Sequence, residues 1–218
     1  MSDKEHVYRG KDIVVRYDLA RCLHSAECLR ALPGVFDTRG RPWVQPDGAP
    51  ADEVAHVVTR CPSGALHFER NDGVPAEGVP ERNTIRVVAE GPLYLRGDIE
   101  VVDGEGRQLR RDTRLALCRC GASSRKPFCD NSHLRVGFDD AGELPDRLFA
   151  EVQPAASGPL TITVRANGSL RCEGSAEIIA AGGEARPAPA SFSLCRCGAS
   201  ERKPACDGSH RRVGFVAE

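Results

Sequence analysis

Two stretches of the chain carry three cysteines and a terminal histidine at one identical spacing. The first reads "CRCGASSRKPFCDNSH" and the second "CRCGASERKPACDGSH", so both follow C-x-C-x8-C-x3-H. Thiolate sulfur and imidazole nitrogen are ligands for zinc and for iron–sulfur clusters. We therefore expect two metal sites. Their candidate ligands are Cys118, Cys120, Cys129 and His133 in the first stretch, and Cys195, Cys197, Cys206 and His210 in the second.

The spacing alone leaves two kinds of site open. A structural zinc ion accepts three cysteines and one histidine, whereas a C-x-C pair can also bind one iron or two neighbouring irons. The C-x3-H pair fits one helical turn, because residues four apart share a helix face. Asp130 and Asp207 stand where the N-cap of such a turn is expected.

The wider pattern, C-x-C-x2-S-x3-P-x-C-D-[GN]-S-H, resembles the CDGSH, or NEET, iron–sulfur family. Its further positions occur twice, as Ser123 and Ser200, Pro127 and Pro204, Asp130 and Asp207, and Ser132 and Ser209. The resemblance implies two 2Fe–2S clusters, each held by three cysteines and one histidine. It also implies a β-rich intertwined dimer, formed here within one chain. Asn131 replaces the family's glycine, and asparagine tolerates the positive φ that this turn needs.

A third group of cysteines lies near the N-terminus. Cys22 and Cys28 stand in "CLHSAEC", and Cys61 opens "CPSGAL". A ferredoxin run has C-x2-C-x2-C with a remote C-P, and here Ser25 occupies the middle position. About residues 10–70 thus resemble a divergent single-cluster, ferredoxin-like domain. Three thiolates predict a 3Fe–4S cluster; a 4Fe–4S cluster would need Ser25, His24 or water as a fourth ligand, and we interpret His24 as an ordinary polar loop residue.

The elements that position these residues follow from apolar patterns. "IVVRYD" and "ALHFE" predict two paired strands, and "SAECLRAL" and "ADEVAHVVTR" predict two helices. Further along, Thr84–Phe138 overlays Thr161–Phe215 without a gap, which predicts two copies of one β-rich unit. The strands "RLALC" and "SFSLC" lead into the two cysteine motifs, while the prolines of "RPAPA" predict an edge or a loop. Cys172 aligns with Leu95, which indicates a core position.

These patterns predict an α+β protein: a small ferredoxin-like domain followed by a β-rich tandem CDGSH domain that forms an intramolecular pseudo-twofold dimer. The expected boundaries are 1–70 for the ferredoxin-like domain, 71–83 for a linker, 84–138 for the first repeat, 139–159 for a connector and 160–218 for the second repeat. The connector is long enough to bring the second repeat against the first, so we expect a monomer.

Composition narrows the function classes. The 218 residues carry a formal net charge of −1, which provides no basic face for nucleic acid. No apolar run is long enough to span a membrane, and the N-terminus is polar, without the apolar core of a signal peptide. Ten cysteines in such a chain favour metal binding in a reducing compartment. We therefore expect a cytoplasmic protein without a membrane or nucleic-acid partner.

The function that these features favour is electron transfer through three iron–sulfur clusters, with a redox protein as partner. The sequence contains no phosphate loop or catalytic dyad, so we do not expect an enzyme. A second hypothesis is storage and delivery of clusters to an apo-acceptor protein, because a single histidine ligand is weaker than a thiolate. A redox or pH sensor and a zinc-only structural module are further alternatives.

Overall fold

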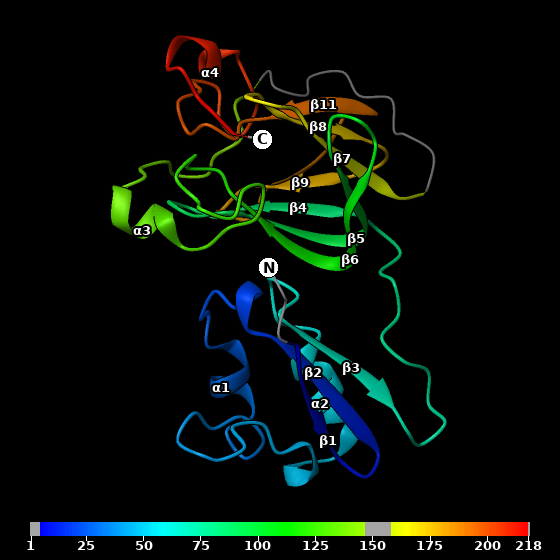
Figure 1. Ribbon diagram of the computed structural model, residues 1–218. Helices are drawn as coiled ribbons and strands as arrows, with labels where there is room; N and C mark the ends of the chain where they lie inside the picture. Colours follow the sequence, from blue (N-terminus) through cyan, green and yellow to red (C-terminus); the bar gives the residue numbers. More distant parts are fainter. Residues whose placement is uncertain (1–4, 147–157, 218) are drawn as a thin grey trace. The chain divides into compact units, whose positions relative to one another are not determined.

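The computed structural model describes residues 5–146 and 158–217. The chain divides into two compact units, Met1–Val79 and Pro80–Glu218, and the boundary falls inside the stretch 71–83 (Figure 1). Part of the expected connector, 139–159, lies outside the described residues. Within the described ranges, no helix has the length and apolar character needed to cross a bilayer.

The first unit is a three-stranded antiparallel sheet, in the order β1-β2-β3, with two short α-helices. Its elements are β1 (Glu5–Arg9), β2 (Ile13–Asp18), the 3₁₀ turns η1 (Leu19–Arg21) and η2 (Pro46–Gly48), α1 (Glu27–Ala31), α2 (Ala51–Val58) and β3 (Leu66–Arg70). The pairing of the two predicted strands and the presence of both helices are confirmed. The sequence did not predict β1, because four of its five side chains are exposed and only Tyr8 is partly buried.

The second unit is an eight-stranded mixed sheet with two helical turns. Its elements are β4 (Thr84–Val87), β5 (Leu93–Val102), β6 (Gln108–Leu117), α3 (Ser132–Val136), β7 (Leu160–Val164), β8 (Leu170–Glu173), β9 (Glu177–Ile179), β10 (Ala185–Pro187), β11 (Ser191–Leu194) and α4 (Ser209–Arg212). The strand order is β10-β9-β4-β5-β7-β8-β11, and β6 pairs with β5. The proline-rich strand β10 is an edge strand, as predicted.

The two repeats exchange strands reciprocally. β4 of the first repeat pairs in parallel with β9 of the second, with Thr84 opposite Glu177. β5 of the first pairs in parallel with β7 of the second, with Glu100 opposite Thr161. Thr161 and Glu177 are the residues that align with Thr84 and Glu100, so both junctions have the same register. Each repeat therefore completes the sheet of the other.

Alternating side chains of these strands form one shared core. Ile85 and Leu95 from the first repeat and Ile162 and Leu170 from the second are at most 1% exposed and belong to the same apolar cluster. Burying each such side chain contributes about 1.5–3 kcal/mol. Cys172 is fully buried in this cluster, which confirms its predicted role as a packing residue. The core thus belongs to both repeats together.

Asn83 fixes the junction between the repeats with three hydrogen bonds. Its Nδ2 donates to the carbonyl oxygens of Gly158 at 2.8 Å and Ser175 at 2.9 Å. Its Oδ1 accepts a hydrogen bond from the backbone amide of Asp98 at 2.8 Å. The side chain lies in a site that leaves Asn83 only 8% exposed, so its partners have little access to replacement water.

Substituting Asn83→Ala should destabilise the second unit by about 1–3 kcal/mol, because it leaves buried polar groups without partners. Urea unfolding followed by circular dichroism measures this loss. The control is Asn71→Ala, since Asn71 is exposed and its amide makes only a 3.5 Å contact with Lys11. Equal unfolding midpoints for Asn83→Ala and the unmodified chain would show that Asn83 does not hold the junction.

Candidate metal centres

Each candidate loop begins where a core strand ends. Cys118 follows β6, and its backbone amide donates to the Pro127 carbonyl at 2.8 Å. The Cys129 amide donates to the Ala116 carbonyl at 2.9 Å. Inside the loop, the Ser123 hydroxyl donates to the Phe128 carbonyl at 2.7 Å. The loop is therefore folded back on the strand, which brings its first and third cysteines to the same end of the sheet.

The second loop repeats this construction after β11. The amide of Cys195 donates to the Pro204 carbonyl at 2.8 Å, and that of Cys206 donates to the Ser193 carbonyl at 2.9 Å. The hydroxyl of Ser200 donates to the Ala205 carbonyl at 2.7 Å. The alignment of the two sequences is thus matched by the same backbone hydrogen bonds.

The eight candidate ligands form pairs at distances that suit one metal ion per pair. Cys118 Sγ and Cys120 Sγ lie 3.7 Å apart, and so do Cys195 Sγ and Cys197 Sγ. The sulfur of the third cysteine lies 3.6 Å from His133 Nδ1 in the first loop and 3.4 Å from His210 Nδ1 in the second. On a tetrahedral ion, two thiolates lie about 3.8 Å apart, and a thiolate and an imidazole nitrogen about 3.5 Å. The donor sets therefore fit metal binding.

No group of three or more His, Cys, Asp or Glu side chains in the described part of the chain is arranged around a single metal position. In each loop the ligands instead form two neighbouring pairs. Cys120 and Cys129, which belong to different pairs of the first loop, are close enough to affect each other's ionisation.

Electrostatics explain why these thiols need a cation. None of the ten cysteines forms a disulfide bond. A hydrogen bond from Cys118 lowers the pKa of Cys120 to about 6, and the same bond raises the pKa of Cys118. Cys197 and Cys195 behave in the same way, with the pKa of Cys197 lowered to about 6. Burial raises the pKa of Cys129 to about 11. Three thiolates can therefore form together at neutral pH only beside a bound metal.

The helical turns differ in detail from the prediction. The N-cap residues are Asn131 for α3 and Gly208 for α4, with φ of 66° and 87°, so the prediction that Asp130 and Asp207 are the N-caps is wrong. The expected positive φ at Asn131 is confirmed. Because α3 begins at Ser132, Cys129 precedes the helix. The left-handed turn at Asn131, rather than a shared helix face, brings Cys129 toward the histidine.

The two aspartates still stabilise the loops. Asp130 accepts hydrogen bonds from the Ser132 amide at 3.0 Å and the Ser124 amide at 2.9 Å, and Asp207 accepts one from the Ser209 amide at 2.9 Å. Burial acts to raise the pKa of Asp130, but these hydrogen bonds outweigh it and hold the pKa far below its usual range. Each carboxylate therefore stays charged and fixes the residues that flank its histidine.

A buried arginine, whose role was not predicted from the sequence, lies between the first two cysteines of each loop. Arg119 and Arg196 are each 1% exposed. Arg119 Nε donates to the Gly91 carbonyl at 3.0 Å, and its guanidinium pairs with Asp140 and lies 4.9 Å from the ring centre of Phe138. The identical C-R-C triplets were the signal that could have indicated it. Each arginine places a fixed positive charge at the base of a ligand loop.

The structure also brings the three N-terminal cysteines together. Cys22 follows η1, Cys28 lies in α1, and Cys61 follows α2. All three pack against the apolar core of the first unit. Burial, and then the nearby sulfurs of Cys61 and Cys22, raise the pKa of Cys28 to about 11. The three thiols thus form one cluster despite their separation in sequence.

Two polar side chains lie beside these thiols. His24 Nδ1 is 3.8 Å from Cys22 Sγ, and Ser63 Oγ is 3.7 Å from Cys61 Sγ. His24 was expected to be an ordinary polar loop residue, although its position two residues after Cys22 could have indicated this contact. Ser25, the expected alternative ligand, uses its carbonyl oxygen to accept a hydrogen bond from Arg30 at 2.9 Å.

Comparison with known proteins assigns each part of the chain to a family. A family model described as "divergent 4Fe-4S mono-cluster" matches residues 8–71. A second, described as "iron-binding zinc finger CDGSH type", matches twice, at residues 90–134 and 167–211. Both CDGSH matches contain the complete cysteine–histidine pattern. The chain is therefore an iron–sulfur or iron-binding protein.

Curated relatives cover a smaller part of the chain. It is 38% identical over 61 residues to "Uncharacterized protein YjdI" of Escherichia coli strain K12, which is 28% of this chain and 80% of the relative. The YjdI protein of Escherichia coli O157:H7 matches to the same extent. No solved structure matches the chain. From the family matches, the chain belongs to the CDGSH iron-binding family in its tandem form, with a divergent 4Fe-4S mono-cluster domain at its N-terminus.

Proposed function

We propose that this protein transfers single electrons through three iron–sulfur clusters. Two are 2Fe–2S clusters, one bound by each C-x-C-x8-C-x3-H loop, and the third is bound by Cys22, Cys28 and Cys61. The observation that carries the proposal is the arrangement of each loop's ligands as two pairs, with sulfur–sulfur distances of 3.7 Å and sulfur–nitrogen distances of 3.6 Å and 3.4 Å. Two pairs suit two irons better than one zinc ion.

The ligand set and its surroundings favour an accessible reduced state. Replacing one thiolate by a neutral imidazole removes one negative charge, which favours electron uptake, as in Rieske centres. The buried guanidinium groups of Arg119 and Arg196 add positive charge at the base of each loop. Both effects stabilise the extra electron, so we expect potentials above those of four-cysteine clusters.

For the N-terminal site we propose a 3Fe–4S cluster, because three cysteine thiols lie near one another on the same apolar core. The matching family is described as 4Fe-4S, and a four-iron cluster is the alternative. It would require a fourth ligand, and serine is a poor iron ligand beside thiolates. His24, with its Nδ1 3.8 Å from Cys22 Sγ, is the nitrogen donor beside these thiols that a four-iron cluster could use.

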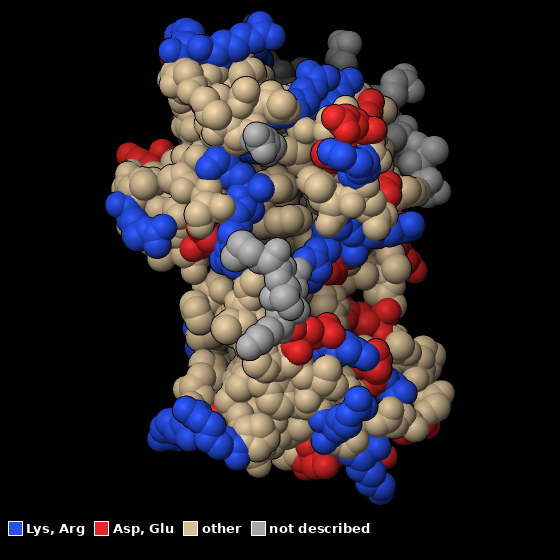
Figure 2. All heavy atoms as spheres, in the orientation of Figure 1, with Lys and Arg blue, Asp and Glu red and all other residues tan. Residues whose placement is uncertain are grey.

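The proposed partner is a redox protein, and the proposed role is that of a carrier without catalysis. The short helix α3 exposes Leu134 to 74% and Val136 to 55% directly beside the ligand His133. Figure 2 shows basic side chains over both α3 and α4. An apolar contact with a basic rim suits an acidic partner. Ten cysteines without a disulfide bond support a reducing compartment such as the cytoplasm.

Delivery of intact 2Fe–2S clusters to an apo-acceptor is the second candidate. It is favoured by the histidine ligands, because one imidazole binds iron more weakly than a thiolate, and by His210, which is only partly buried. Incubation of the holo-protein with an apo-ferredoxin distinguishes the candidates. Cluster transfer at a rate faster than spontaneous cluster loss would favour delivery, and its absence would favour electron transfer.

The tandem repeats are proposed to form an intramolecular dimer, so that the chain is a monomer. The reciprocal registers of β4 with β9 and of β5 with β7 support this arrangement. The intact chain should sediment as a single species of 23.5 kDa. A chain that ends after Asp146 should either unfold or dimerise with itself, because β4 and β5 lose their parallel partners. A stable monomer of that shortened chain with a bound cluster would contradict the shared sheet.

Substituting His133→Cys should lower the potential of the first 2Fe–2S cluster, because a fourth thiolate adds negative charge. His210→Cys should do the same to the second cluster only. Redox titration followed by visible absorption and EPR measures both potentials. Cys172→Leu is the control, since Cys172 is a core residue aligned with Leu95; it should keep both potentials and the full iron content. Unchanged potentials in both cysteine variants would remove the histidines from the ligand set.

The oxidised protein should give the EPR signal of a 3Fe–4S cluster, which has an odd electron count when oxidised. Ser25→Cys should convert this site toward a four-iron cluster and abolish the signal, with about one more iron per chain. Ser63→Cys, beside Cys61 but outside the C-x5-C run, serves as the control. A fully loaded, oxidised wild-type protein without this signal would contradict the three-iron assignment.

A further inference from the structure

The two ligand loops touch each other through a pair of glycines. Gly121 follows Cys120 and Gly198 follows Cys197, with φ of 78° and 82°. A Cβ atom built on Gly121 would lie 2.5 Å from the Cys197 carbonyl oxygen, and one built on Gly198 would lie 2.7 Å from the Cys120 carbonyl oxygen. Real Cβ atoms do not approach backbone so closely, so only glycine fits at either position. Each loop therefore packs directly on the backbone of a ligand cysteine of the other loop.

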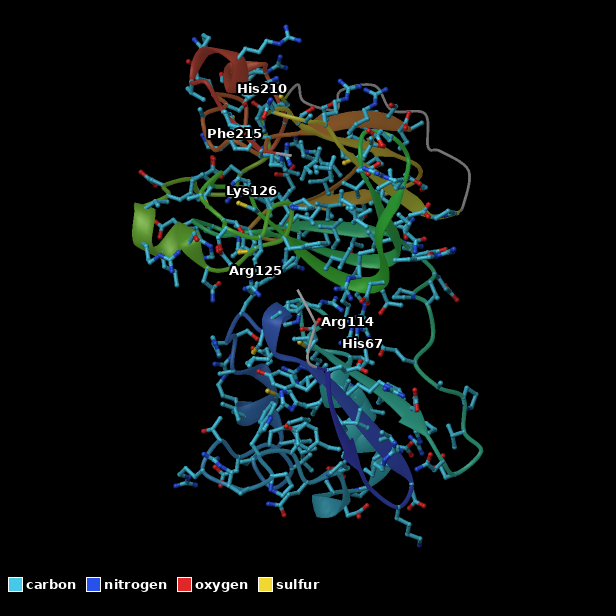
Figure 3. The ribbon with its side chains drawn as sticks, in the orientation of Figure 1. His67, Arg114, Arg125, Lys126, His210 and Phe215 are labelled. Carbon is cyan, nitrogen blue, oxygen red and sulfur yellow. The ribbon has the colours of Figure 1, made fainter. Side chains whose placement is uncertain are left out.

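A chain of charged groups joins the same two loops. Arg119, between the first two cysteines of the first loop, pairs with Asp140. Asp140 Oδ2 lies 3.8 Å from Nζ of Lys203, a residue of the second loop. Lys203 Nζ also donates to the Ser200 carbonyl at 2.6 Å. Figure 3 labels Lys126, which holds the same position in the first loop and donates to Ser123. Backbone packing at the two glycines and this chain of charged groups thus connect the same pair of sites.

We propose that these contacts couple the two sites, so that each site retains its cluster more tightly when the other is filled. This rests on the proposed function, in which each loop binds a 2Fe–2S cluster. A bound cluster ties the two ligand pairs of a loop together, and a loop without its cluster lacks that tie and can relax. Relaxation at Cys197 removes the surface on which Gly121 packs, and relaxation at Cys120 does the same to Gly198. Packed interfaces transmit such changes because they lack space to absorb them.

Coupling of this kind must be reciprocal. If filling the first site tightens the second by some factor, filling the second tightens the first by the same factor. Couplings between sites in proteins are typically about 5- to 150-fold. Equality of the two factors separates coupling from simple damage, which has no reason to be symmetric. A partner that takes one cluster would then loosen the other.

The experiment uses the full-length holo-protein and empties one site at a time. Cys129→Ala and Cys206→Ala each remove a ligand that is remote in sequence from the glycine contact. An iron chelator is then titrated against each variant, and the cluster remaining in the intact loop is followed by visible absorption and iron content. We expect the intact site to weaken by about 5- to 150-fold relative to the same site in wild type, by an equal factor in both variants. Wild-type retention in both would overturn the proposal.

Glycine variants test the contact itself. In Gly198→Ala, the added Cβ forces the loops apart, so emptying one site should no longer affect the other. Gly106→Ala is the matched control, because Gly106 has the same φ of 82° and no atom within 4 Å of an added Cβ. It introduces the same backbone strain and should keep the coupling. Coupling that persists in Gly198→Ala would exclude the glycine contact as its route.

Asp140→Asn provides a second variant in case Gly198→Ala fails to bind any cluster. It adds no atoms and weakens the link between Arg119 and Lys203, so the coupling factor should fall while both sites still load. An unchanged coupling factor would exclude the chain of charged groups as a route.

Iron and acid-labile sulfide in the wild-type protein are measured before the variants. Stoichiometric zinc would contradict the proposed function, whereas full iron and sulfide with independent sites would contradict the coupling alone.

Discussion

The tandem unit depends on two short parallel strand pairs, β4 with β9 and β5 with β7. Neither repeat supplies both strands of either pair, so the ladders between β4 and β9 and between β5 and β7 form only across the repeats. The same junction closes the apolar core, since Ile85 and Ile162 lie in one cluster. The two repeats must therefore pack together correctly before the sheet can form. The ends of β6 and β11, and the metal-binding loops that follow them, depend on that sheet for their positions.

The ligand loops were predictable because metal ligation imposes a local spacing. The cysteines and histidines of each loop lie within sixteen residues, and the structure brings them into pairs as that spacing requires. Strands such as β2 and β3 were predictable for a similar reason, since their buried faces make an apolar pattern. The exposed β1 has no such pattern and was missed.

Features that depend on distant backbone could not be predicted in this way. Asp130 was expected as an N-cap because of its residue type, but the left-handed turn at Asn131 shifts the helix start by one position. Arg119 looked like an ordinary charged residue, and its burial follows from carbonyl groups in the turn before β5 and from Asp140. The role of Gly121 depends on a loop in the other repeat. For Arg119 and Gly121 the decisive partner lies outside their own motif, whereas the turn at Asn131 lies inside it and only its effect on the helix start was missed.

The two helical turns beside the histidines differ from each other because both halves are encoded in one chain. In a symmetric dimer encoded by one short gene, every substitution appears in both subunits, so the two faces must stay identical. Here each face is encoded separately: Leu134 stands beside His133, whereas the aligned residue beside His210 is Arg211. Leu134 is 74% exposed and Arg211 is also exposed. The surfaces beside the two similar metal sites therefore differ chemically, one being apolar and the other basic. Because the halves are encoded separately, each can change by itself while the shared sheet keeps both in register.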